Sequence, residues 1–446
     1  MLVGVWSRPL FTLIYAIPSL AGQNAARLFS LMICLVIAYQ TWRLAEELGI
    51  ARAPLVIAFL WLQPMFFIYC VDTMTELVFA LVFVSALRLH HRGRVKAGMT
   101  VASMAILARP EGFFLGVLWG IWVLVGVQPV GKQVLSVRSL RPRALLTIPL
   151  LATGAFSWWL AALFITRDPL YIRDNWPPNW AVTGSSYGTA GLYAYPLRLP
   201  EIVGLFMLPP FLYGLIHLLK QRRLFTITSS FLLLFVLHTI LRAFGLFGSA
   251  GYPRYLLSVS PAIALISLTG WNLMARRFST RTLRIAATLI IFGASGIANF
   301  VYADCLELPR DARAIEQIYQ WFQARERQFT VRRYIWCEPY AGIQFDADPW
   351  ENPVFTGNHE NDLNLLRESP PGTLIYWDER VGPKWVGLKA ADFADAGYAL
   401  LHSQSFVLKG YLDRSWFGYG GPRKQTMYLF YKPLEEKETK ILKSGG

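Results

Sequence analysis

Apolar residues in the first two thirds of the chain form long runs separated by short polar segments. Several runs approach the ~20 residues that an α-helix needs to cross a bilayer. They predict about ten membrane-spanning helices, at residues 28–42, 54–71, 75–89, 97–108, 112–127, 144–166, 202–219, 225–243, 255–274 and 283–302. The apolar stretch 9–20, which contains Pro9 and Pro18, is too short to span and predicts an interfacial helix.

Basic residues concentrate in alternate polar segments. Of the 25 Lys and Arg residues before position 303, 17 lie in or at the edges of the segments that follow the odd-numbered runs. Because cytoplasmic loops are enriched in Lys and Arg, we place these segments in the cytoplasm. The outer face then holds 1–27, 72–76, 109–112, 167–201, 242–254 and everything after 302. Met1 would therefore begin on the outer face, with no preceding span.

Composition supports a membrane protein, and the charge distribution argues against nucleic-acid binding. The chain is 54% hydrophobic and only 16% charged, which is too apolar for one soluble domain. The net charge is +15, but residues 303–446 hold 18 basic and 20 acidic residues. The basic excess thus lies in the loops between spans, and the soluble part offers no basic face.

The last part of the chain changes character. Residues 311–325 have helical apolar spacing, and 373–377, 398–401 and 427–431 read as strands. The sequence therefore predicts a multi-pass α-helical membrane domain at 1–302 and a soluble α/β domain at 303–446. Cys34 and Cys70 are expected in the core, and a Cys305–Cys337 disulfide stays an open alternative.

Arg109-Pro110-Glu111-Gly112 interrupts two apolar runs. Pro and Gly break a helix and free backbone groups that need partners. Charges at membrane depth are costly unless they face water, a partner or a ligand. Together with Asp72 and Glu76, also on the outer face, they predict a polar cavity that opens outward.

Four segments resemble the GT-C superfamily of integral-membrane glycosyltransferases. The resemblance covers most of residues 1–300. Its motifs are Ala25-Ala26-Arg27-Leu28-Phe29-Ser30, Asp72-Thr73-Met74-Thr75-Glu76, Leu107-Ala108-Arg109-Pro110-Glu111-Gly112 and Tyr252-Pro253-Arg254-Tyr255-Leu256-Leu257. The last of these is followed by Pro261, and each motif is short, but the four occur in the family's order.

The resemblance implies transfer of a hexose, mannose among the candidates, from a polyprenyl-phosphate carrier to a glycan, lipid or protein acceptor on the outer face. It also implies a bacterial inner-membrane protein with a periplasmic C-terminal domain. Such enzymes carry a catalytic acid in a first outer loop. We expect that loop and the first span to be missing before Trp6, which puts the activity of the chain in doubt.

Glycosyl transfer from a phosphate needs a cation at the phosphate and a base near the acceptor. Arginine binds phosphate through its planar fork. The candidates for phosphate binding are Arg254, placed first, Arg109, Arg242 and Tyr255. Those for catalysis are Glu76, Glu111 and Asp72, although Arg109 and Glu111 could instead pair to hold the broken helix.

Aromatic residues of the segment 167–201 could stack on sugar rings or form an interfacial belt. The candidates for sugar or acceptor binding are Trp176, Trp180 and Tyr187. No metal site is predicted, because Asp72 alone is not one, although a divalent cation stays open. Two other readings also stay open: a secondary transporter and a catalytically inactive relative of the superfamily.

Overall fold

The computed structural model describes the chain except for residues 1–2, 5–7, 127–141, 177–188, 305–307, 349–350, 354, 356, 381, 409–422 and 435–446. Contacts between Cα atoms divide it into two compact units, Met1–Ala303 and Asp304–Gly446. We call them the membrane unit and the C-terminal unit.

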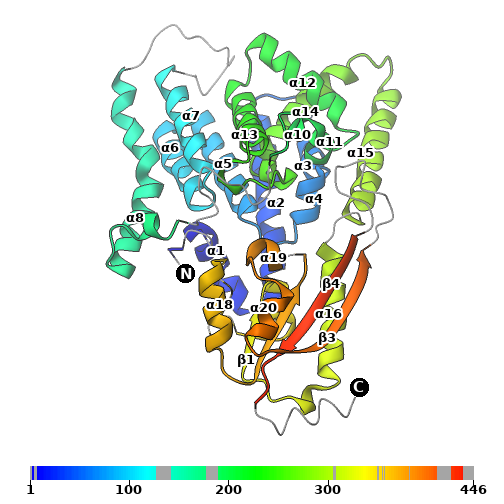
Figure 1. Cartoon of the computed structure of the whole chain (residues 1–446). Coiled ribbons are helices and arrows are strands. Elements are labelled where there is room, and N and C mark those ends of the chain that lie inside the picture. The colour runs from blue at the N-terminus through cyan, green and yellow to red at the C-terminus, as the bar shows by residue number, and fades with distance from the viewer. Residues whose placement is uncertain are drawn as a thin grey trace. The chain divides into compact units, whose positions relative to one another are not determined.

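The membrane unit consists of helices (Figure 1). They are α1 (Pro9–Leu20), α2 (Gln23–Glu47), η1 (Ala53–Leu55), α3 (Val56–Trp61), α4 (Pro64–Tyr69), α5 (Thr75–His91), α6 (Val95–Ser103), η2 (Met104–Leu107), α7 (Gly112–Leu124), η3 (Pro142–Ala152), α8 (Thr153–Thr166), α9 (Tyr171–Asp174), α10 (Ala194–Leu197), α11 (Leu199–Val203), α12 (Leu208–Gln221), α13 (Phe225–Ala243), η5 (Leu246–Gly248), η6 (Pro253–Val259), α14 (Ser260–Ala275) and α15 (Arg281–Asp304), where η marks a 3₁₀-helix.

Among the described residues, five helices are long and apolar enough to cross a membrane. They are Gln23–Glu47, Ala144–Thr166, Phe225–Ala243, Pro253–Ala275 and Arg281–Tyr302. The fourth is 83% buried within the protein, whereas Ala144–Thr166 and Arg281–Tyr302 are each 17% buried. The fourth helix therefore lies at the centre of the unit, and α8 and α15 lie at its two edges (Figure 1).

The predicted span 54–71 is not one helix. It is broken between α3 and α4, where the chain leaves the helical conformation at Gln63 before Pro64. The side chain of Asn299 donates to the carbonyl of Leu62 at 3.0 Å. The Gln63 amide donates to the carbonyls of Phe59 and Ser260 at 3.1 and 3.0 Å. Side chains thus satisfy the backbone groups that the break frees, as a break at membrane depth requires.

Two glycines let α12 and α14 approach each other closely. A Cβ at Gly270 would lie 1.8 Å from the carbonyl oxygen of Pro210, and one at Gly214 would lie 2.2 Å from that of Ile266. No real Cβ tolerates these distances, so only glycine fits. Small residues bring backbones together in this way in membrane proteins, where van der Waals contact replaces the hydrophobic effect.

We therefore expect Gly270→Ala to destabilise the protein by about 1–3 kcal/mol or more, because α12 and α14 must move apart. Gly293→Ala in α15 is the matched control, since a Cβ there would have no neighbour within 4 Å. Thermal unfolding of the purified chain in detergent measures both. Equal melting temperatures for the two variants would contradict the close approach.

The C-terminal unit is an α/β domain, as the sequence predicts. Its elements are α16 (Leu308–Gln323), η7 (Glu326–Gln328), β1 (Arg333–Trp336), α17 (Pro339–Gln344), α18 (His359–Glu368), β2 (Thr373–Asp378), α19 (Gly382–Trp385), α20 (Ala390–Asp395), β3 (Ala399–Leu408) and β4 (Arg423–Tyr431). The strand order is β1-β2-β4-β3, with β1 and β2 parallel and the other pairs antiparallel.

Side chains of β2 alternate between two apolar layers. Leu374 and Tyr376 pack with residues of α16 and α17, whereas Ile375 and Trp377 pack with residues of α18 and α20. The sheet is therefore covered on both faces. Strand β1 is missing from the sequence prediction, and β3 extends well beyond the predicted 398–401.

Three of the four cysteines lie in the part of the chain that the structure describes. Cys34 is buried, as predicted, and Cys70 is half-buried. Cys337 is buried, with its Sγ atom 3.4 Å from the backbone nitrogen of Asp378. Cys305 lies outside the described residues, and Cys337 is a free cysteine in the structure, so the alternative of a Cys305–Cys337 disulfide is not supported.

Candidate functional site

The Arg109–Gly112 segment forms a tight turn between η2 and α7. The Arg109 N–H donates to the carbonyl of Ala105, and the Gly112 N–H donates to the carbonyl of Arg109. A Cβ at Gly112 would lie 2.3 Å from the backbone nitrogen of Ile106, so glycine is required for this close approach. The turn buries the carboxylate of Glu111, which is 7% exposed.

Arg109 bridges two buried glutamates. Its Nε and Nη2 donate to the two oxygens of Glu111 at 3.1 and 2.7 Å. Its Nη1 lies 2.8 Å from Glu76 Oε1 and donates to Thr75 Oγ1 at 3.2 Å. Glu76 is in the first turn of α5, where the helix dipole favours a negative charge. The pairing of Arg109 with Glu111 that the sequence left open is therefore present, and Glu76 joins it.

Arg254 is the second cation of this cluster, and it is held more loosely. Its Nε lies 3.6 Å from Glu76 Oε1, and its guanidinium lies 4.8 Å from the ring centroid of Tyr252 and 5.9 Å from that of Tyr69. Its side chain is 29% exposed, against 13% for Arg109 and 3% for Glu76. Of the two arginines, Arg254 is thus the more accessible to solvent.

Aromatic rings and one histidine enclose the cluster. The guanidinium of Arg109 lies 5.0 Å from the ring centroid of Tyr255. Nε2 of the buried His238 lies 3.4 Å from Glu111 Oε1. The Tyr195 hydroxyl donates to the carbonyl of Tyr252 at 3.0 Å, which ties α10 to the segment that carries Arg254.

Asp72 lies at the margin of this cluster and is half-buried. Burial raises the pKa of its carboxyl above the usual value, and the nearby charges of Arg27 and Arg254 partly offset this effect. Within the described residues it forms no ion pair shorter than 4 Å. Unlike Glu76 and Glu111, Asp72 therefore has no arginine paired with it at short distance within the described residues.

The remaining predicted site residues are Arg242, Trp176, Trp180 and Tyr187. Arg242 packs against Gly251 and donates to the carbonyl of Ser249 at 3.4 Å, so it braces the loop before η6. Trp176 is exposed at 39%, after the short helix α9. Trp180 and Tyr187 lie outside the described residues, so sugar binding by this segment stays a prediction.

Sequence reasoning missed Tyr69, Tyr195 and His238. The signal for His238 was a lone histidine in the apolar run 225–243, which more often marks a core residue than a functional one. The part of the chain that the structure describes contains no group of three or more His, Cys, Asp or Glu residues arranged to hold a metal ion.

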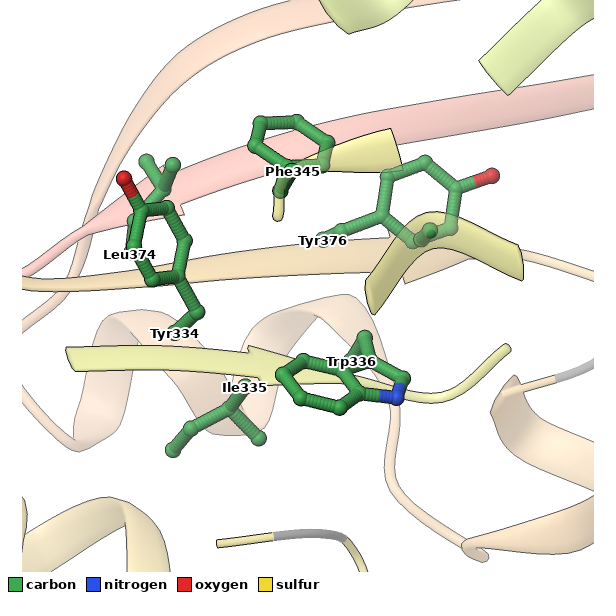
Figure 2. Close-up of a pocket in the computed structure, with 7 residues that line it drawn as sticks. Tyr334, Ile335, Trp336, Phe345, Leu374 and Tyr376 are labelled. Atoms are coloured by element: carbon green, nitrogen blue, oxygen red, sulfur yellow. The ribbon is translucent and has the colours of Figure 1, made fainter. Parts of the chain in front are cut away.

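Figure 2 shows a pocket in the C-terminal unit. It lies between β1, β2 and α17 and is lined by Tyr334, Ile335, Trp336, Ala341, Phe345, Leu374 and Tyr376. No lining residue is charged, and the only titratable groups among the lining residues are the phenols of Tyr334 and Tyr376. The buried charged groups of the membrane unit are therefore the candidate site.

The helical membrane unit, with its broken helices, and the C-terminal α/β unit together define a multi-pass α-helical membrane protein with an added α/β domain, which confirms the fold class predicted from the sequence. The chain is similar to the crystal structure of ArnT from Cupriavidus metallidurans bound to undecaprenyl phosphate. The TM-score is 0.52 at 10% identity, with 94% of this chain and 87% of ArnT covered.

The apo structure of the same ArnT matches with a TM-score of 0.49 at 12% identity, over 95% of this chain and 87% of ArnT. No protein-family profile and no curated protein sequence matches the chain. The likeness to ArnT bound to the lipid phosphate establishes the shared fold.

Proposed function

We propose that this protein is a membrane glycosyltransferase that takes a sugar, a hexose such as mannose, from a polyprenyl-phosphate carrier. The observation that carries the proposal is Arg254, a partly exposed arginine beside a cluster that is otherwise internally paired. An anion can bind Arg254 without breaking the bonds of Arg109. ArnT, which shares the fold, was crystallised with undecaprenyl phosphate.

The cluster supplies what the departure of a phosphate requires. Arg254 would bind the phosphate oxygens and stabilise the charge that grows on them as the bond from the sugar to phosphate breaks. Tyr255 would lie beside the phosphate with its hydroxyl as a donor. Arg109 would mainly stabilise the structure of the site, because its guanidinium is already paired with Glu76 and Glu111.

The base near the acceptor is, in this proposal, Asp72. It would take the proton from the acceptor hydroxyl while the sugar is transferred on the outer face. Its raised pKa lies closer to neutral pH than that of an ordinary aspartate. A general base is most effective when its pKa is close to the working pH. The proposal also places the protein in the bacterial inner membrane, with its C-terminal unit on the periplasmic face.

Reconstitution of the full chain in liposomes with a panel of radiolabelled polyprenyl-phosphate hexoses tests it. We expect label to move from the carrier to a glycan, lipid or protein acceptor, and unlabelled undecaprenyl phosphate to compete. Liposomes without protein are the control. Transfer from no donor in the panel would contradict the proposal, and uptake of a soluble solute by the same liposomes would favour a transporter instead.

A further inference from the structure

His238 is a buried histidine whose ring nitrogens both lack a hydrogen-bond partner among the described residues. It lies on α13 and is 2% exposed. A buried polar group without a partner is costly, so its retention calls for an explanation. The nearest ionised atom is Glu111 Oε1, which lies 3.4 Å from Nε2.

The groups around His238 come from several elements. The ring of Tyr195, on α10, lies 5.9 Å away at an interplanar angle of 22°, and that of Tyr255, on η6, lies 5.0 Å away at 32°. Beyond Glu111, the charges that act on His238 are those of Arg109 and Glu76. Glu111 Oε1 already accepts a hydrogen bond from Arg109 Nη2 at 2.7 Å, and a carboxylate oxygen has room for a second donor such as a protonated imidazole.

Among the groups of the cluster that pair within 4 Å of an opposite charge, the formal charges balance without His238. Glu76 and Glu111 are each paired with Arg109, and Glu76 also faces Arg254, so two negative charges meet two positive ones. A bound phosphodiester would add one negative charge. An uncompensated charge in such a buried place is expensive, and a proton on His238 next to Glu111 would restore the balance.

We propose that His238 takes up a proton from solvent when a phosphate group binds at Arg254. The proposal rests on the proposed function. His238 does not touch the phosphate. It acts through Glu111 and Arg109, and is therefore a positioning residue that compensates charge. The sign follows from this linkage: the bound state holds more protons, so affinity falls as pH rises, by up to about tenfold per pH unit for one proton.

The experiment uses the full chain in lipid nanodiscs and a polyprenyl-phosphate hexose, a phosphodiester whose own charge does not change between pH 5 and 8. Titration calorimetry in buffers of different ionisation enthalpy counts the protons taken up on binding. We expect up to one proton per ligand for the natural chain and none for His238→Phe, which keeps a ring against Tyr195 and Tyr255. His238→Gln serves as a second variant should the phenylalanine disturb folding.

His90→Phe is the matched control. His90 is equally buried, its two ring nitrogens also lack hydrogen-bond partners among the described residues, and it packs against Trp119 rather than a carboxylate. This variant should retain proton uptake, and so should Asp72→Asn. Uptake that disappears in Asp72→Asn and persists in His238→Phe would overturn the inference.

The outcomes also separate this inference from the proposed function. Binding without proton uptake, or with the same uptake in His238→Phe, overturns the inference and leaves the proposed function in place. No binding of the polyprenyl-phosphate hexose at any pH contradicts the proposed function and removes the inference with it.

Discussion

Replacing Arg109 with methionine should destabilise the protein by about 3–5 kcal/mol, the cost of leaving a buried charge without its partner. Here one cation serves two carboxylates, because Arg109 binds Glu111 through two nitrogens and Glu76 through a third. The side chain is only 13% exposed, so water cannot replace these bonds. Thermal unfolding of the purified chain in detergent should show a large loss of melting temperature.

Arg43→Met is the control for this measurement. Arg43 also pairs with a glutamate, Glu46, but both side chains are more than a third exposed. An exposed ion pair contributes about 0–1 kcal/mol, so this variant should melt close to the natural chain. A second test is Arg109→Met combined with Glu111→Met, which should recover part of the loss. Equal melting temperatures for Arg43→Met and Arg109→Met would contradict the role of Arg109.

Replacing Arg254 with glutamine should weaken binding of a polyprenyl-phosphate hexose by roughly 10- to 100-fold. Hydrogen bonds to a charged partner contribute about 1.5–3 kcal/mol, and each 1.4 kcal/mol is tenfold in affinity. The protein should lose less stability than in Arg109→Met, because Arg254 is partly exposed and approaches Glu76 only at 3.6 Å. The affinity for the donor, measured on the chain in nanodiscs, should therefore fall strongly, whereas the melting temperature should fall less than in Arg109→Met.

Arg277→Gln is the matched control for Arg254. Its guanidinium also lies over a tyrosine ring, that of Tyr213, at 5.4 Å, and it follows the other end of α14. It faces no carboxylate of the cluster, so affinity for the lipid phosphate should not change. If both variants bound the donor as tightly as the natural chain, Arg254 would have no place in the site.

The sequence predicted those parts of the site that interrupt a strong pattern. Arg109 and Glu111 stand out because charges, proline and glycine break an apolar run, and the resulting topology puts Asp72 and Glu76 on the same face. His238 could not be predicted in this way, because one histidine in a long apolar run does not interrupt the hydrophobic pattern. Its significance comes from Glu111, a residue far away in the sequence.

The fold shows a similar limit. The run 54–71 is apolar throughout, so periodicity could not reveal the break at Gln63, and Pro64 is acceptable in the first turn of a helix. Strand β1 was missed because its four residues, Arg333 to Trp336, mix charge and aromatic rings. It is a strand because it pairs with β2, a contact that local sequence does not encode.

The bridge formed by Arg109 has a consequence for the order in which the protein assembles. Glu76, Arg109 and Glu111 all belong to the early part of the chain and together leave one excess negative charge. Arg254, the cation that compensates this charge, lies much later in the chain and is therefore synthesised later. It stands at the start of Pro253–Ala275, the central helix of the membrane unit. We therefore expect the attraction between Arg254 and Glu76 to help this later helix pack against the earlier ones.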